Sequence, residues 1–232
     1  MIEYPKVKNA KFISRPNRFI AIASVDGKEE TVHVKNTGRC KELLVEGCDV
    51  ILYESDNKAR KTKYDLVAVY KERNGNKPLL INMDSQIPNA VAEEWLKKGN
   101  LFSKNAKIRR EVIFGNSRFD IYVEDGNTKA FVEVKGVTLE ENGIAMFPDA
   151  PTERGIKHIN ELVSAISKGY KAYVLFIIQM AEITEMRPND ITHKAFGDAL
   201  REAYRKGVNI LALDCKVTES TIEAKNYIDI VL

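Results

Sequence analysis

The chain has 232 residues, of which 44% are hydrophobic and 30% charged, the balance of an ordinary globular protein with enough length for one large core or two small ones. Its 36 basic and 33 acidic residues give a net charge of only +3, which by itself selects neither nucleic acid nor membrane as a partner. Cys40, Cys48 and Cys215 form no C-x-x-C pair, which argues against a disulfide framework and a zinc site. The N-terminal stretch MIEYPKVKNAKF has no apolar signal segment, and residues 172–178, the longest apolar run, are too few to cross a bilayer. We therefore expect a cytoplasmic protein.

Short β-favouring runs follow one another through the first third of the chain, separated by turn residues such as Asp26-Gly27 and Glu46-Gly47. One small helix is expected near residues 40–44. Five or so short strands within about 80 residues are typical of a small antiparallel barrel, so we predict an OB-fold-like barrel over residues 1–84. The expected strands are 7–14, 18–25, 29–35, 48–54, 66–70 and 79–83.

Beyond residue 84 the pattern changes to alternating helices and strands. Pro88 begins a helix that Gly99 ends, and Thr152 is placed to cap a second helix that Gly169 ends. Residues 170–179 are almost all apolar, as expected for a strand covered on both faces. The fold class predicted is therefore α/β, or α+β with two domains: the barrel, then a mixed sheet flanked by helices over residues 85–232. Its other elements are strands 107–114, 118–123, 129–137 and 208–213 and a helix over 192–206.

The stretch FDIYVEDGNTKAFVEVK (119–135) places charged residues inside two predicted strands. A Gly126-Asn127 turn would put Asp120 directly opposite Glu133, and a Gly115-Asn116 turn would put Glu111 opposite Asp120. Residues directly opposite share a face of the sheet, with Cβ atoms roughly 5 Å apart. The spacing therefore predicts a row of three carboxylates, with Lys135 on the same face two residues beyond Glu133.

Three like charges in a row destabilise a sheet unless a cation binds them or their pKa values rise. Carboxylate and carbonyl oxygens suit Mg²⁺ (or Mn²⁺), and we predict Asp120, Glu133, Glu111 and the Val134 carbonyl as metal ligands. Asp120, Glu133 and Lys135 form the predicted catalytic set, in which Lys135 stabilises developing negative charge or positions the attacking water. The alternative is the solvated face of an ordinary hairpin. A one-residue bulge would break the register and would weaken the assignment of Glu111 most.

These residues, in this order, resemble the core of the PD-(D/E)XK nuclease superfamily. Asp120 matches its first acid and Glu133-Val134-Lys135 its E-x-K, which implies Mg²⁺-dependent hydrolysis of nucleic-acid phosphodiesters. The chain departs from the pattern at Phe119, where the superfamily has proline. The superfamily often places a further acid on its first helix, so Glu93 and Glu94 compete with Glu111 for the third ligand position.

Four longer stretches together resemble the sugar fermentation stimulation protein family, SfsA: NTGRCKELL (36–44), RREVIFGNSRFDIYV (109–123), FVEVKGVTL (131–139) and FPDAPTERGIKHINEL (147–162). The resemblance implies an OB-fold N-terminal domain, a nuclease-like C-terminal domain and DNA binding without marked sequence preference. It also implies a part in regulating sugar utilisation, notably of maltose.

Residues that would bind nucleic acid come from three parts of the chain. Gly38 and Arg39 lie in the loop before the predicted small helix, and Arg118 precedes the predicted first acid. Arg154 and His158 lie on the second helix, on the face opposite an apolar stripe, where Arg154 would meet phosphate and His158 would shuttle a proton or donate to phosphate. A solvated helix face is the alternative. Asp149 would lie in the metal's surroundings or cap its own loop.

Three functions fit these patterns. The first is a Mg²⁺-dependent DNA endonuclease. The second is a non-enzymatic DNA-binding regulator of sugar (maltose) utilisation with a vestigial nuclease site. The third is a barrel module that binds an oligosaccharide or nucleotide, which leaves the carboxylate row unexplained. In the first two the partner is DNA and not a membrane, no protein partner is evident, and a homo-oligomer stays open.

Overall fold

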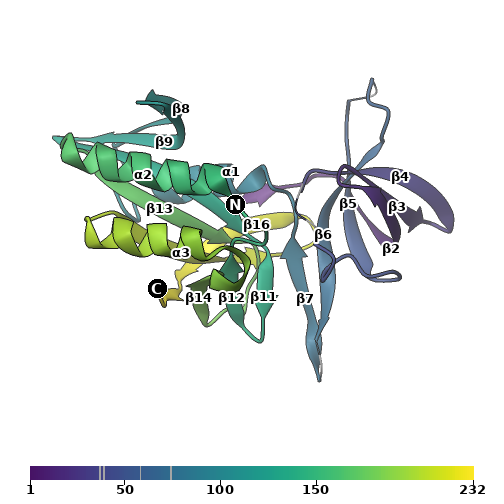
Figure 1. Cartoon of the computed structure of the whole chain (residues 1–232). Helices are drawn as coiled ribbons and strands as arrows, with labels where there is room; N and C mark the ends of the chain where they lie inside the picture. The colour runs from purple at the N-terminus through teal and green to yellow at the C-terminus, as the bar shows by residue number, and fades with distance from the viewer. Residues whose placement is uncertain (37, 39, 58, 74) are drawn as a thin grey trace.

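The computed structural model of the chain describes residues 1–36, 38, 40–57, 59–73 and 75–232. A barrel built from the first third of the chain stands beside a layered α/β part built from the rest (Figure 1). The mixed α/β class and the OB-type N-terminal barrel predicted from the sequence are both confirmed.

The barrel is a six-stranded antiparallel sheet closed on itself. Its strands run in the order β4-β3-β2-β5-β6-β7, and β4 also pairs with β6 in parallel, which closes the sheet. Alternate residues point inward, and Ala21, Ala23, Val32 and Val34 are fully buried there. The bounds are β2 (Val7–Asn17), β3 (Ile20–Val25), β4 (Lys28–Val34), β5 (Asp49–Glu54), β6 (Tyr64–Arg73) and β7 (Asn76–Asn82).

The prediction of a small helix near residues 40–44 is wrong. Residues 41–43 form a turn, in which the backbone N–H of Leu44 donates to the carbonyl of Cys40 at 2.9 Å. A single turn of this kind buries Cys40, Leu43 and Leu44 against the barrel core without continuing as a helix.

A seven-stranded mixed sheet forms the centre of the α/β part. Its order is β1-β16-β15-β13-β10-β9-β8, with parallel pairing from β10 through β13 to β15 and antiparallel pairing elsewhere. The central strand β13 is buried along nearly its whole length, as its apolar sequence predicts. The bounds are β1 (Ile2–Glu3), β8 (Lys107–Phe114), β9 (Ser117–Asp125), β10 (Thr128–Val137), β13 (Lys171–Ile178), β15 (Asn209–Val217) and β16 (Thr221–Tyr227).

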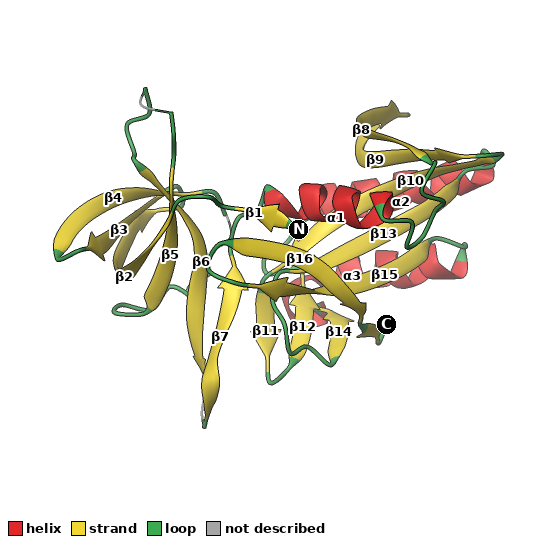
Figure 2. Ribbon diagram, turned by 180° about the vertical axis from the view of Figure 1, so that it is seen from behind, coloured by secondary structure: helices red, strands yellow, loops and turns green. Residues whose placement is uncertain are grey.

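Three helices cover the two faces of this sheet (Figures 1 and 2). Helix α1 (Ile87–Lys97) packs through Val91, Trp95 and Leu96 on one face, and α2 (Glu153–Ser167) and α3 (Asp190–Arg205) pack on the other. Thr152 caps α2 as predicted, because its Oγ1 accepts a hydrogen bond from the Gly155 N–H at 3.0 Å. No helix of the described residues is long and apolar enough to span a membrane.

A small four-stranded sheet lies below the main one and was not predicted from the sequence, since strands of two to four residues are too short to show an alternating pattern. Its strand order is β11-β12-β14-β17. The bounds are β11 (Leu139–Glu141), β12 (Ile144–Phe147), β14 (Glu185–Pro188) and β17 (Asp229–Ile230).

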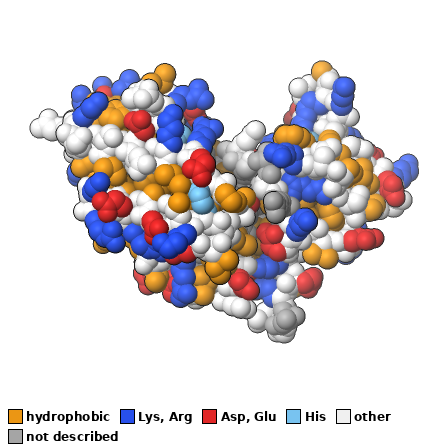
Figure 3. Space-filling view, viewed as in Figure 1, with side chains coloured by type: hydrophobic (Ala, Val, Ile, Leu, Met, Phe, Trp, Pro, Cys, Tyr) orange, Lys and Arg blue, Asp and Glu red, His pale blue; other side chains and the backbone are white. Residues whose placement is uncertain are grey.

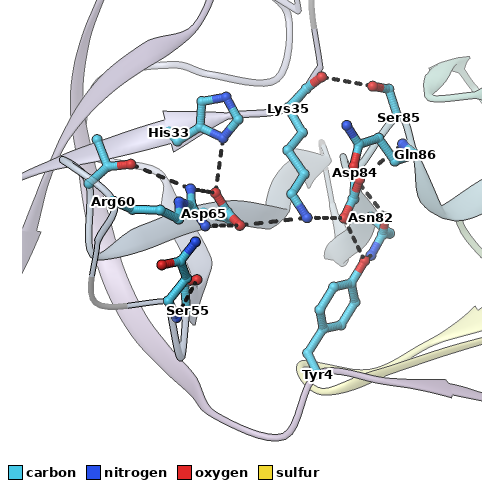
Figure 4. Close-up of polar contacts among 12 residues, drawn as sticks. Tyr4, His33, Lys35, Ser55, Arg60, Asp65, Asn82, Asp84, Ser85 and Gln86 are labelled. Atoms are coloured by element: carbon cyan, nitrogen blue, oxygen red, sulfur yellow. Dashed lines mark hydrogen bonds and ion pairs between the residues drawn. The ribbon is translucent and has the colours of Figure 1, made fainter.

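A network of buried polar residues joins the barrel to the α/β part (Figure 4). The Lys35 Nζ lies 3.0 Å from Asp84 Oδ2 and 3.6 Å from Asp65 Oδ2. Asp65 also contacts Arg60 and His33. Residue 84 thus lies in this junction, between β7 and α1. The domain boundary placed there stays a prediction. The strand β1 pairs with β16 and so belongs to the seven-stranded sheet.

Candidate functional site

The two hairpins that carry the candidate site have the predicted registers. Strands β9 and β10 pair from Thr128 with Asp125 as far as Val132 with Ile121, and β8 and β9 pair from Lys107 with Glu124 to Phe114 with Ser117. The expected direct pair of Asp120 with Glu133 does not form. Instead, the Asp120 Oδ2 accepts a hydrogen bond from the Val134 N–H at 2.8 Å, so the side chain continues the ladder where the two strands part.

Asp120 is half-buried on β9 and contacts β10 and the first turn of α1. Its Oδ1 accepts a hydrogen bond from Asn89 Nδ2 at 2.9 Å. Burial, and next the negative charge of Glu133, raise the pKa of the Asp120 carboxyl above its usual value. Glu133 is therefore close enough for the two carboxylates to repel each other, which is the situation that a bound cation relieves.

Glu133 is only 2% exposed, and its two oxygens differ sharply. Oε1 accepts hydrogen bonds from Lys135 Nζ, at 2.6 Å, and from His158 Nδ1. Oε2 is buried and has no hydrogen-bond partner among the described residues. Burial alone would raise the pKa of Glu133, but the His158 hydrogen bond and the Lys135 charge outweigh it and hold the pKa below its usual value. The carboxylate is thus ionised, with one oxygen left unbonded.

Glu111 does not join the two carboxylates, so the row of three predicted from the register is wrong. Its backbone takes a φ of +58°, outside the extended region, and no pair of Glu111 with Asp120 forms. The half-exposed carboxylate instead meets Arg118 Nε at 2.8 Å. Of the competing acids on α1, Glu93 bonds Lys97 at 2.5 Å, and Glu94 contacts Lys98 at 2.8 Å.

Asn89 holds Asp120 but was not predicted as a site residue. It lies on the first turn of α1, directly after Pro88 and one helical turn before Glu93. The resemblance to the nuclease superfamily points to an acid on this helix and does not single out an amide. The signal that could have identified Asn89 is its place at the start of the helix, on the face that a following acid one turn later would share.

His158 lies on the opposite side of α2 from the one predicted. The ring is 6% exposed and faces the sheet, where Nδ1 contacts Glu133. The buried stripe of the helix runs through Gly155, His158, Ile159, Leu162 and Ala165. A histidine can occupy this buried position because Glu133 supplies a hydrogen-bond partner for its ring. Arg154 is exposed, and its Nε donates to His158 Nε2 at 3.4 Å.

The loop of the barrel with predicted DNA contacts lies against the loop that precedes α2. The Gly38 N–H donates to Asn36 Oδ1 at 2.8 Å, so this amide is already bonded. A Cβ on Gly38 would lie 2.3 Å from Asp149 Oδ2, so only glycine allows this close approach. Asp149 thus lies at the barrel loop. Arg39 lies outside the described residues. Arg118 is exposed on β9, paired with Glu111.

The residues present fit a hard divalent cation only with help from other ligands. Within the described parts of the chain, no three His, Cys, Asp or Glu side chains are grouped so that they could hold a metal ion by themselves. Two carboxylates, one of them with an unbonded buried oxygen, leave the other positions to water, phosphate or a backbone carbonyl. Mg²⁺ accepts such a shared coordination sphere, because it keeps several waters and needs only one or two protein carboxylates.

Comparisons with known proteins agree on one family. The model of the sugar fermentation stimulation protein RE domain matches residues 86–221, and that of the SfsA N-terminal OB domain matches residues 13–77. A sugar fermentation stimulation protein homolog of Desulfitobacterium hafniense is 58% identical over 100% of this chain and 99% of that protein. One of Clostridium beijerinckii is 53% identical over the whole of both chains. The structure of Pyrococcus furiosus SfsA in complex with Ca²⁺ is 26% identical, with a TM-score of 0.84 over 100% of this chain and 98% of that one.

Proposed function

This chain belongs to the sugar fermentation stimulation protein (SfsA) family, and from that premise we propose that it binds DNA and hydrolyses its phosphodiester bonds with the help of a divalent cation. The cation would be Mg²⁺ or Mn²⁺, and Asp120 and Glu133 would hold it. The Val134 carbonyl is a further ligand in this proposal, whereas Glu111 is left out because it is paired with Arg118.

The observation that supports this proposal most is the unbonded Oε2 of Glu133. A buried ionised carboxylate oxygen without a partner costs free energy of about 1–3 kcal/mol or more, and such groups persist where a ligand satisfies them. The raised pKa of Asp120, caused by burial and then by Glu133, means that its ionised form is disfavoured at this position. A cation between these carboxylates would remove both penalties. The Ca²⁺ bound by the Pyrococcus relative is consistent with such a site.

The chain's own residues would divide the work as follows. Asn89 and the Val134 N–H fix the orientation of Asp120, and Lys135 fixes Glu133 through Oε1. The Lys135 ammonium, 15% exposed, also lies where it can stabilise negative charge that develops on a phosphate. When bound, the cation would polarise the phosphate and lower the pKa of a coordinated water.

DNA would lie in the notch between the barrel and the α/β part, because Lys and Arg side chains line both sides of it (Figure 3). The exposed Arg154 would bind phosphate near the carboxylates, since its Nε contacts the same His158 that bonds Glu133. Arg118 would bind phosphate by exchanging Glu111 for the nucleic acid. Gly38 would contribute to DNA binding by allowing the barrel loop to approach Asp149 closely. Contacts of this kind carry no base preference.

Plasmid nicking tests the proposal. Purified protein is incubated with supercoiled plasmid in Mg²⁺, in Mn²⁺ and in EDTA. We expect nicking with either cation and none in EDTA. Asp120→Ala and Lys135→Ala should lower the rate by about 10²–10³-fold. Glu111→Ala, which removes an acid of the same hairpin, serves as the matched control and should retain activity. Absence of nicking with every cation, or equal rates for Asp120→Ala and wild type, would contradict hydrolysis.

A second candidate function is DNA binding without hydrolysis, as a regulator of sugar (maltose) utilisation. The observation that favours it is the pairing of Glu111 with Arg118, which leaves only two carboxylates at the site. This candidate predicts no nicking by the wild type, together with a DNA affinity that falls as the salt concentration rises, because bound phosphates release counterions.

A further inference from the structure

His158 contacts the candidate metal ligand Glu133 directly and is not itself a ligand or an acid–base group in the arrangement observed. Its Nδ1 bonds Glu133 Oε1, and its Nε2 accepts from Arg154 Nε at 3.4 Å. The tautomer that satisfies both contacts carries its proton on Nδ1. Both ring nitrogens are therefore engaged, which leaves no lone pair for a cation and no free N–H for a phosphate.

We propose that His158 is a positioning residue that selects which oxygen of Glu133 receives the divalent cation. Lys135 and His158 both donate to Oε1, so this oxygen is committed to protein donors. Oε2 is left as the single unbonded oxygen of the carboxylate. The inference rests on the proposed function, since it assigns His158 a role toward the cation of that site.

The ring of His158 is itself held from two sides. Phe119, which is fully buried and stands where the nuclease superfamily has proline, lies edge-on to it with ring centroids 6.2 Å apart and an interplanar angle of 77°. Arg154, one helical turn earlier on α2, contacts its Nε2. The departure at Phe119 thus has a consequence at the site, because the aromatic ring before Asp120 packs against the histidine that orients Glu133.

Without the histidine, one of the two donors to Oε1 is lost. The Glu133 carboxylate can then rotate about its last torsion and offer both oxygens to the Lys135 ammonium, which has three donors on a flexible stem. A cation would have to displace that pairing before it could bind. Residues that orient a metal ligand through a hydrogen bond typically change metal affinity by about 10–100-fold when they are replaced.

Calorimetric titration with Ca²⁺ tests this role, with plasmid nicking in Mg²⁺ as a second readout. His158→Phe keeps an aromatic ring against Phe119 but removes the donor to Glu133. His158→Asn restores a donor at the position of Nδ1. The matched control is His193→Phe on α3, because His193 contacts Thr152 and Glu153 and neither candidate metal ligand. Thermal melts without cation show whether each variant is folded.

We expect His158→Phe to raise the Kd for Ca²⁺ by at least about tenfold. His158→Asn and His193→Phe should stay within about threefold of wild type in Ca²⁺ Kd, well short of that effect. If His158→Phe is folded and binds Ca²⁺ as the wild type does, the inference is wrong, and plasmid nicking by the wild type would still support the proposed function. If His158→Asn loses as much affinity as His158→Phe, packing rather than hydrogen bonding is responsible, and the inference is again wrong. If the wild type binds no Ca²⁺ and nicks nothing, the inference and the proposed function fail together.

Discussion

The carboxylates at the barrel junction and those at the β9–β10 hairpin differ in how completely their oxygens are bonded. At the junction between the barrel and the α/β part, Asp65 and Asp84 are each 2% exposed. Both oxygens of Asp65 meet Arg60, and those of Asp84 meet the Gln86 N–H and Lys35.

At the hairpin, Glu133 is equally buried, but its Oε2 has no partner among the described residues. The pKa values of Asp65 and Asp120 also differ. Burial would raise the pKa of Asp65, but hydrogen bonds from Arg60 and then His33 hold it below its usual value, whereas burial and Glu133 raise that of Asp120. The fully bonded group can hold two parts of a fold together. The incompletely bonded group leaves a buried acceptor oxygen without a partner among the described residues.

The largest expected effect comes from breaking the junction. In Lys35→Met, the Oδ2 of Asp84 loses the Lys35 ammonium and keeps only its long contact with the Tyr4 hydroxyl. Asp65 also loses the positive charge of Lys35. We expect the free energy of unfolding to fall by about 3 kcal/mol, because a buried carboxylate loses its partner. Urea denaturation at pH 7 measures this change in the free energy of unfolding. Lys8→Met, which breaks the exposed pair of Lys8 with Asp26, should cost no more than about 0.5 kcal/mol. A loss below about 1 kcal/mol in Lys35→Met would contradict the structural role.

The next effect depends on pH. Because the folded-state pKa of Asp65 is lowered, its ionised form stabilises the fold above the unfolded-state pKa, and this stability is lost as the pH falls through the folded-state pKa. Asp65→Asn should therefore lose about 2 kcal/mol of unfolding free energy at pH 7 and progressively less below about pH 4. Denaturation of both proteins at pH 7, 5 and 3 gives the difference. A difference that does not change with pH would show that Asp65 acts through its shape and not its charge.

Cation binding separates the two groups directly. At ten times its Kd, Ca²⁺ should raise the unfolding free energy of the wild type by about 1.4 kcal/mol, since it binds only the folded chain. Asp120→Asn should show no such increase, whereas Asp65→Asn, altered at the other carboxylate group, should show the full one. Thermal melts with and without Ca²⁺ measure it. Equal responses of the two variants would mean that the cation binds elsewhere.

The smallest expected effect is the change in stability of cation-free Asp120→Asn. Because the folded-state pKa of Asp120 is raised, ionisation costs the fold stability as the pH rises from the unfolded-state value through the folded-state value. Neutralising the side chain removes this cost at pH 7 and changes little at pH 3. The loss of one hydrogen bond offsets part of the gain, so the net change stays within about 1 kcal/mol. The difference in unfolding free energy between Asp120→Asn and the wild type should change with pH in the opposite sense to the difference measured for Asp65→Asn. Changes in the same sense would contradict the comparison.

Local turn chemistry made much of the site predictable. The Gly115-Asn116 and Gly126-Asn127 turns fix both registers, so the proximity of Asp120 and Glu133 follows from the sequence. The positive φ at Glu111 cannot be predicted in this way, because nothing in an alternating strand pattern marks one residue for the left-handed region. The orientation of Glu111 toward Arg118 could therefore not be predicted.

The orientation of α2 was mispredicted for a different reason. Ile156, Ile159, Val163 and Ile166 suggest a stripe by their hydrophobicity, yet of these only Ile159 is fully buried and the other three are partly buried. The buried stripe includes His158, whose burial depends on a carboxylate supplied by a strand 25 residues earlier. A partner that distant in sequence gives no periodic signal. The junction was missed likewise, because Lys35, Asp65 and Asp84 read separately as ordinary surface charges.

The pairing of β1 with β16 has a consequence for the order in which the chain can be completed during synthesis. Ile2 and Glu3 pair with Ile222 and Thr221, and the Tyr4 N–H donates to the Ser220 carbonyl at 2.7 Å. The strands β2 to β7 find their pairing partners within residues 7–82, whereas β1 takes its partner from residues 221 and 222. β1 therefore has no strand to pair with until β16 has been synthesised. A chain cut off just before residue 220 would lack β16, so its β1 would have no partner in the seven-stranded sheet.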